Sequence, residues 1–168
     1  HDDSYAFGLA SIVSVVRASG YNAKVIIVRD RAAYPKILEE ILVFQPRVIG
    51  FTSVSSQFGF VKEIAVLIKQ KLPDCIIVCG GVHPTINPDC VLEAKCLDAI
   101  FVGESEDSFV EFLNKVEHGE DYKDVDNIAY VMNAKVKVNK LKPLIANLDR
   151  LPYPDKEIYP YADTLKET

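Results

Sequence analysis

The sequence predicts a doubly wound α/β domain, in which helices cover both faces of a parallel sheet. Helix-like and strand-like segments alternate along the chain, and only a few residues connect one to the next. This order is typical of parallel strands joined by right-handed helical crossovers. A chain of 168 residues is also long enough to bury a hydrophobic core without metals or disulfides.

The predicted helices rest on apolar residues at helical spacing. In the first, over residues 7–19, Leu9, Ile12 and Val16 recur on one side, and Gly20 supplies a C-terminal stop. The same spacing predicts further helices over residues 34–44, 59–71, 88–94 and 106–117.

Short β-branched apolar runs predict the strands, because such runs are typical of strands that are covered on both faces. The predicted strands are residues 24–29, 47–52, 75–79 and 99–102. Since the repeat would begin with a strand and the sequence opens on a helix, we expect one more strand before Tyr5. The sequence opens with His1-Asp2-Asp3-Ser4, without an initiator Met or a secretory leader, and we interpret the chain as a fragment of a longer cytoplasmic protein.

The pattern changes after the last of these helices. Residues 127–132 and 136–139 are strand-like and flank Asn133-Ala134, which predicts a hairpin. Residues 148–155 are punctuated by prolines and predict an extended exit segment. The predicted organisation is thus an α/β domain over 1–125, a hairpin extension over 126–147 and a linker over 148–168.

Composition excludes several function classes. The net charge is −5 and the 19 Lys and Arg residues are scattered, which argues against nucleic-acid binding. The apolar runs are far shorter than the roughly 20 residues of a membrane-spanning helix. Cys75 and Cys79 lie four apart in a predicted strand, roughly 13 Å, and Cys90 and Cys96 fall on different faces of a predicted helix. We expect four reduced cysteines and no metal site.

Polar and glycine residues follow three predicted strands, at the edge where parallel strands present their carboxyl ends. Ligands of open α/β sheets bind at this edge. Paired glycines let a ligand approach the backbone, and short hydroxyl side chains can bind it without filling its space. The three loops contain Thr52, Ser53, Ser55 and Ser56; Gly80, Gly81, Val82, His83, Pro84 and Thr85; and Gly103 and Glu104.

A structural interpretation of the same loops stays open. Gly80-Gly81 is also compatible with a tight turn, and Ser55, Ser56 and Ser105 with helix caps. His83 is more typical of a loop hydrogen bond than of a metal ligand. The sequence contains no phosphate-binding loop ending in Lys-Ser or Lys-Thr and no GxGxxG after a strand. We predict no catalytic residue.

Several motifs of the chain occur together, in the same order, in one known family. They are Gly8-Leu9-Ala10, Gly20-Tyr21, residues 48–53 (VIGFTS), Pro73-Asp74, residues 79–85 (CGGVHPT), residues 103–109 (GESEDSF) and residues 148–155 (LDRLPYPD). Over nearly its whole length the chain resembles the N-terminal cobalamin (B12)-binding domain of B12-dependent radical SAM enzymes. The resemblance implies a flavodoxin-like (Rossmann-like) three-layer α/β/α fold that precedes a radical SAM core, and that core is absent from this chain.

The resemblance also implies how the cofactor is held. Cobalamin domains that bind through a histidine carry an Asp-x-His-x-x-Gly loop, and in the equivalent residues 3–8 the histidine position is Tyr5. Cobalamin would then be base-off and without a histidine ligand (His-off). Tyr5 and Phe7 would lie beneath the corrin, Thr52 and Ser56 would contact the nucleotide tail, and Gly80 and Gly81 would give it room. The residues implied at the cofactor are Tyr5, Phe7, Gly8, Thr52, Ser53, Ser55, Ser56, Gly80, Gly81, Val82, His83, Pro84, Thr85, Gly103 and Glu104.

The predicted function is a cobalamin-binding module of a B12-dependent radical SAM methyltransferase or cyclase, not catalytic by itself. In the full-length protein the resemblance implies a [4Fe–4S] cluster and S-adenosylmethionine, one molecule of which supplies a methyl group to cobalamin while a second is cleaved to a radical. The predicted partners are cobalamin and the radical SAM core of the same chain. Two alternatives remain: a degenerate module without cofactor that serves as a docking or scaffold domain, and a small flavin-binding module of similar topology.

Overall fold

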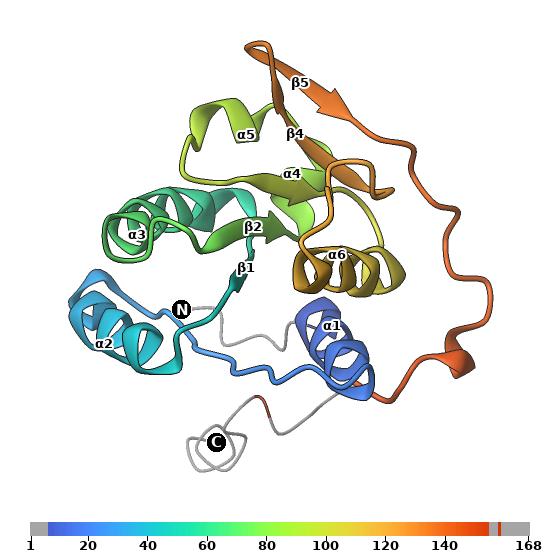
Figure 1. Cartoon of the computed structure of the whole chain (residues 1–168), viewed down its shortest axis with the longest axis horizontal. Coiled ribbons are helices and arrows are strands. Elements are labelled where there is room, and N and C mark those ends of the chain that lie inside the picture. The colour runs from blue at the N-terminus through green and yellow to red at the C-terminus, as the bar shows by residue number, and fades with distance from the viewer. Residues whose placement is uncertain (1–6, 155–157, 159–168) are drawn as a thin grey trace. The chain divides into compact units, whose positions relative to one another are not determined.

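The computed structural model describes residues 7–154 and residue 158 of the chain. The chain divides into a larger unit of residues 26–144 and a smaller unit of residues 1–25 with 145–168 (Figure 1). The smaller unit contains α1 (Phe7–Ala18) and a 3₁₀ turn, η3 (Leu148–Arg150). The helix predicted over 7–19 is confirmed, and Gly20 follows it at a φ of +89°. One 3₁₀ turn lies within the segment that we predicted to be extended.

The larger unit is built on one five-stranded sheet. In spatial order the strands are β1 (Val48–Thr52), β2 (Ile76–Gly80), β3 (Ala99–Phe101), β4 (Ile128–Met132) and β5 (Lys135–Val138). β1, β2 and β3 are parallel, whereas β4 runs antiparallel to β3 and to β5. The predicted hairpin is confirmed, and it continues the sheet beyond β3. The sheet is therefore mixed.

Helices cover both faces of this sheet, as the predicted fold class requires (Figure 1). α2 (Tyr34–Phe44), α3 (Phe58–Lys71) and α5 (Cys90–Glu93) pack on one face, where Ile64, Ile77 and Ile100 are almost fully buried. α6 (Glu106–His118) packs on the other face through Phe112. The predicted helices 34–44, 59–71 and 106–117 are thus confirmed to within one residue at each end.

The strand predicted over 24–29 is wrong. Residues 21–29 form no helix or strand, although Ile26 and Val28 pack against the core and Ile27 is exposed. This alternation is what a strand with one buried face would show. A strand, however, also needs a neighbour for its backbone groups, and no other part of the described chain forms a ladder with this segment.

Short helical turns replace parts of the predicted loops. α4 (Val82–Ile86) occupies the loop after β2, and η1 (Arg31–Ala33) and η2 (Ser55–Gln57) precede α2 and α3. The helix predicted over 88–94 is only α5, and Cys96 lies in a turn and not on a helix with Cys90, which corrects that prediction. Pro88 disfavours helical backbone at Asn87, which separates α4 from α5.

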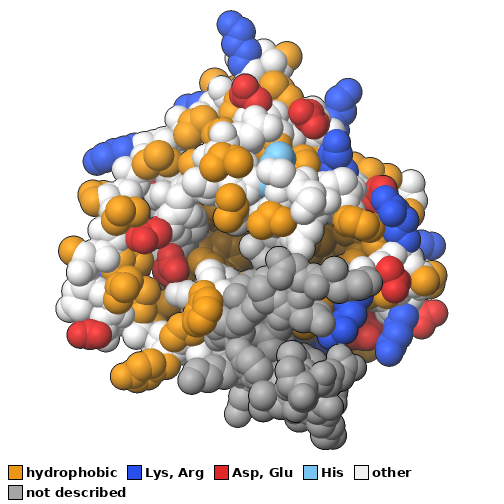
Figure 2. Space-filling view, turned by 180° about the vertical axis from the view of Figure 1, so that it is seen from behind, with side chains coloured by type: hydrophobic (Ala, Val, Ile, Leu, Met, Phe, Trp, Pro, Cys, Tyr) orange, Lys and Arg blue, Asp and Glu red, His pale blue; other side chains and the backbone are white. Residues whose placement is uncertain are grey.

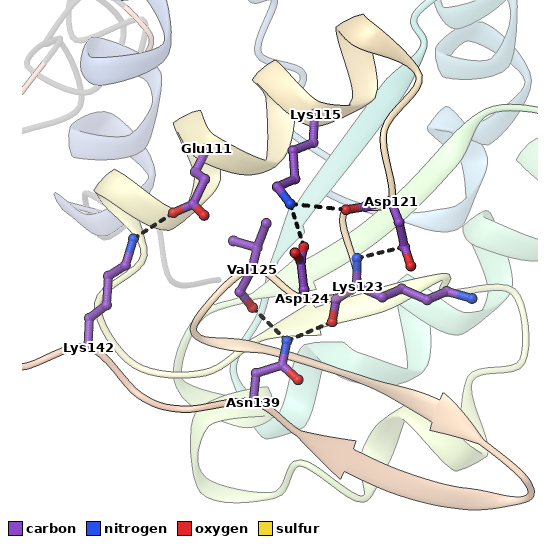
Figure 3. A network of polar contacts seen from close by, with 8 residues as sticks. All are labelled: Glu111, Lys115, Asp121, Lys123, Asp124, Val125, Asn139 and Lys142. Carbon is purple, nitrogen blue, oxygen red and sulfur yellow. Dashed lines mark hydrogen bonds and ion pairs between the residues drawn. The ribbon is translucent and has the colours of Figure 1, made fainter.

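Polar contacts join the segments before and after the hairpin to α6 and to each other (Figure 3). Lys115 Nζ donates to Asp124 Oδ1 at 2.6 Å, and Lys142 Nζ to Glu111 Oε2 at 2.8 Å. Asn139 Nδ2 donates to the Lys123 and Val125 carbonyls at 2.8 and 2.7 Å. The loop before β4 and the segment after β5 are thus each bonded to α6, and Asn139 bonds these two segments to each other. The hairpin turn itself places Asn133 and Ala134 at φ values of +51° and +59°.

All four cysteines are free thiols. Cys75, Cys79 and Cys90 are buried, whereas Cys96, which we also expected to be buried, is only partly so. Burial raises the pKa of Cys75, Cys79 and Cys90 to about 11, about 12 and about 11 respectively. These thiols therefore stay protonated at neutral pH. Within the described residues, no three His, Cys, Asp or Glu side chains are grouped as metal ligands are, and no helix is long and apolar enough to cross a membrane.

Candidate functional site

The carboxyl ends of β1, β2 and β3 bring three loops of the larger unit together. Because the three strands are parallel, all end at the same edge of the sheet, and Thr52 of β1 lies opposite Gly80 of β2. The Ser53 amide then donates to the Gly80 carbonyl at 3.1 Å. Within this unit the predicted loops are neighbours.

His83 joins the first loop to the second. Its backbone amide donates to the Ser53 carbonyl at 3.1 Å, and its ring Nδ1 shares a hydrogen bond of 3.0 Å with Ser55 Oγ. The imidazole also lies on Phe58, the first residue of α3, with ring centroids 4.4 Å apart. His83 therefore makes a hydrogen bond between loops, which is the role that the sequence favoured over metal binding.

Thr85 joins the second loop to the third. Its hydroxyl donates to the Gly81 carbonyl at 2.8 Å and accepts from the Gly103 amide at 3.0 Å. One side chain thus satisfies a carbonyl after β2 and an amide after β3. Through His83 and Thr85, the Gly-Gly-x-His-Pro-Thr motif therefore links all three loops at the carboxyl edge of the sheet.

Replacing Thr85 with valine is expected to lower the free energy of unfolding by about 1 kcal/mol, because the isosteric side chain leaves the Gly103 amide without this partner and leaves the Gly81 carbonyl only its bond from the Thr85 amide. Urea unfolding followed by circular dichroism measures the change. Thr85→Ser is the matched control, since it keeps the hydroxyl. Equal midpoints for the valine and serine variants would contradict the bracing role.

The two glycines after β2 differ in what surrounds them. Gly81 has a φ of +96°, and a Cβ built on it would lie 2.7 Å from Thr52 Oγ1 and 2.9 Å from the backbone N and O of Ser53. Among the described residues, a Cβ on Gly80 would meet only the Cβ of Phe101, at an ordinary 3.7 Å. Gly81 is therefore required by the contact between the loops themselves, whereas the described residues leave space beside Gly80.

The serines at this edge do not act as side-chain caps. Ser105 occupies the N-cap position of α6, yet its hydroxyl donates to the Gly103 carbonyl at 3.1 Å. Ser55 and Ser56 begin η2, whose N-cap is Val54. Both are exposed, as is Thr52. The edge thus presents short hydroxyl side chains to solvent.

Asn127 positions the third loop, and sequence reasoning missed it. The residue is buried, and its Nδ2 donates to the Val102 carbonyl at 2.8 Å. Its Oδ1 accepts from Ser108 Oγ at 3.2 Å and from the Lys142 amide at 3.0 Å. The only signal in the sequence is a polar side chain directly before an apolar strand, which is also typical of an exposed turn.

A family profile described as B12 binding domain matches residues 1–113, more than half of the chain. The chain belongs to the B12-binding domain family. Cobalamin is the cofactor of this family, and the edge described above fits it: Gly80 leaves open space beside exposed hydroxyl groups.

The B12-binding domain has longer relatives. An uncharacterized methyltransferase, PH0819, of Pyrococcus horikoshii is 30% identical over 155 residues, which are 91% of this chain and 34% of that protein. The anaerobic magnesium-protoporphyrin IX monomethyl ester cyclase of Rubrivivax gelatinosus is 27% identical over 150 residues, 85% of this chain and 27% of that protein. The domain thus spans about a third or less of the length of these relatives.

Solved structures share the fold of this B12-binding domain. TsrM, a radical S-adenosylmethionine methyltransferase of Kitasatospora setae with cobalamin and a [4Fe-4S] cluster bound, superposes with a TM-score of 0.74 at 16% identity, covering 94% of this chain and 30% of that one. The radical enzyme OxsB with aqua-cobalamin and S-adenosylmethionine bound gives 0.74 at 23% identity, covering 92% and 22%. The flavodoxin-like expectation is confirmed.

The remaining predicted site residues are distributed as follows. Tyr5 lies outside the described residues, and Phe7 and Gly8 open α1 in the smaller unit, where Phe7 is exposed. In the larger unit Val82 is exposed and Pro84 is buried under the edge. The remaining loop residue, Glu104, is also exposed there.

The surface outside the grey region of Figure 2 carries acidic and basic side chains in small mixed groups among hydrophobic ones. No broad field of one sign lies on this view of the described residues. A nucleic-acid-binding surface would need clustered positive charge. The scattered charges predicted from the sequence are therefore scattered on this face as well.

Proposed function

We propose that the chain is the cobalamin-holding module of a B12-dependent radical SAM enzyme of the methyltransferase or cyclase type. Membership of the B12-binding family and the braced glycine and hydroxyl edge support this function. The relatives named as a methyltransferase and a cyclase extend well beyond the matched region, which supports a catalytic core elsewhere in the full-length chain. That core would hold the [4Fe–4S] cluster and S-adenosylmethionine, and the protein would be cytoplasmic.

The module's own residues would hold the cofactor and position it. Thr52, Ser55 and Ser56 offer exposed hydroxyl groups to the nucleotide tail, and Gly80 leaves room for it. His83 is engaged with Ser55, which supports a positioning role instead of ligation to cobalt. When bound, cobalamin would supply a cobalt centre able to carry a methyl group to the substrate of the full-length enzyme.

The proposed binding mode is base-off and His-off, because the sequence has Tyr5 where histidine-ligating cobalamin domains carry their axial histidine. A phenol, with a reference pKa of about 10, stays protonated at neutral pH and is a poor ligand. Tyr5 and Phe7 would then only shield the lower face of the corrin, with Gly8 next to Phe7 at the start of α1.

The 168-residue chain is expected to retain hydroxocobalamin through a desalting column and to shift its visible spectrum to the base-off form. Tyr5→Phe should leave that spectrum unchanged. Tyr5→His should produce a His-on spectrum that is lost on acidification, because imidazole with a reference pKa near 6.5 ligates only when neutral.

Two results would count against this proposal. Failure to retain cobalamin would favour the degenerate docking module, and a base-on spectrum would contradict the binding mode. A strong spectral change in Tyr5→Phe together with none in Tyr5→His would show that Tyr5 does not lie at the axial position.

A further inference from the structure

One face of the sheet loses its large side chains towards the carboxyl edge. On the α6 side, β1 carries Gly50 and then Thr52, and β2 carries Val78 and then Gly80, with Gly50 opposite Val78 and Thr52 opposite Gly80. Gly50 and Thr52 are exposed although they lie within a strand. These four residues form what we call the glycine strip, which has no side chain larger than valine; Gly80 in it is partly buried and Val78 almost fully buried.

An aromatic side chain borders the glycine strip. A Cβ built on Gly50 would meet Phe109 Cζ at 3.6 Å and Val78 Cγ2 at 4.0 Å. The Phe109 ring also contacts Phe101 of β3, with ring centroids 5.2 Å apart. The tip of Phe109 therefore reaches over the strip from α6.

Phe109 is less enclosed than the other phenylalanines of this cluster. Phe112 is fully buried and Phe101 nearly so, whereas Phe109 is only half-buried. The reason is its place in the chain: α6 begins at Glu106, directly after the third loop, so its first turn lies at the carboxyl edge of the sheet. One side of the ring packs on the core, and the remainder lies at the strip.

We propose that Phe109 is the residue against which the aromatic base of the cobalamin tail packs. This inference rests on the proposed function, because a base-off cofactor must bury its base somewhere other than on cobalt. Gly50 and Thr52 leave exposed sheet surface on which a flat ring fits, and the half-buried Phe109 ring offers an apolar contact beside it, packed in turn on the buried Phe101. Aromatic pairs of this kind add to the free energy gained from burial alone.

Cobinamide tests this assignment, because it keeps the corrin and lacks the nucleotide tail. In the 168-residue chain, Phe109→Ala is expected to weaken cobalamin binding about tenfold relative to cobinamide binding, measured by isothermal titration calorimetry of both corrinoids. Phe109→Tyr should restore most of that difference, since it keeps the ring.

Leu113→Ala is the matched control. Leu113 lies one turn further along the same side of α6 and packs half-buried against the same core, away from the carboxyl edge. Leu113→Ala should lower the free energy of unfolding without altering the ratio of the cobalamin affinity to the cobinamide affinity. Equal losses for cobalamin and cobinamide in Phe109→Ala, no loss in either, or the same change of ratio in Leu113→Ala would each overturn the assignment. An unaltered chain that binds neither corrinoid would instead contradict the proposed function beneath it.

Discussion

Replacing Gly81 with alanine is expected to lower the free energy of unfolding by on the order of 3 kcal/mol. Two costs combine. The φ of +96° is one that side-chain-bearing residues rarely adopt, and the new Cβ would lie within 2.9 Å of the Ser53 backbone, which cannot move without breaking its bonds to Gly80 and His83. Urea unfolding monitored by circular dichroism measures the loss.

Gly59→Ala is the control for this variant. Gly59 lies in α3, and a Cβ there meets nothing within 4 Å, so alanine should change stability by less than about 1 kcal/mol, in the stabilising direction. If Gly81→Ala unfolded at the same urea concentration as Gly59→Ala, the described contact between the first and second loops would be wrong.

Gly81 also shows where sequence reasoning about the site reaches its limit. The sequence indicates that paired glycines follow a strand, and it favours clearance for a ligand or a tight turn. It does not indicate that one glycine faces the protein while the other faces open space, because that depends on the Ser53 backbone, which belongs to the loop after β1. The roles of His83 and Thr85 depend in the same way on partners far along the chain.

The elements that could be predicted are those whose signal is local. α2, α3 and α6 carry apolar stripes over three turns or more, and the hairpin is marked by two strand-like runs around Asn133-Ala134. Residues 24–29 have the composition of a strand and lack a ladder partner among the described residues, so composition was insufficient there. The pairing of the hairpin with β3 was not predictable either, because it depends on contacts between distant parts of the chain. One of these is the bond from Asn127, just before β4, to the Val102 carbonyl, just after β3.

Replacing Gly80 with valine is expected to weaken cobalamin binding about 100-fold while leaving the free energy of unfolding within about 1 kcal/mol of its original value. Gly80 is the last residue of β2, where the backbone suits a β-branched side chain, and its Cβ would make only an ordinary contact with Phe101. The two γ-methyl groups would, however, occupy the glycine strip that we assign to the tail. Gly80→Ala, which adds the Cβ alone, should lose less affinity.

The effect of Gly80→Val should also depend on the tail itself. Cobinamide has no nucleotide to pass over β2, so its affinity should fall far less than that of cobalamin in the same variant. Gly81→Ala cannot make this distinction, because it disturbs the Ser53 backbone first. A folded Gly80→Val chain that bound cobalamin as tightly as the original would show that the tail takes another route, and the assignment of Phe109 would then fail with it. A parallel loss of both corrinoids would place Gly80 beneath the corrin ring instead of along the tail.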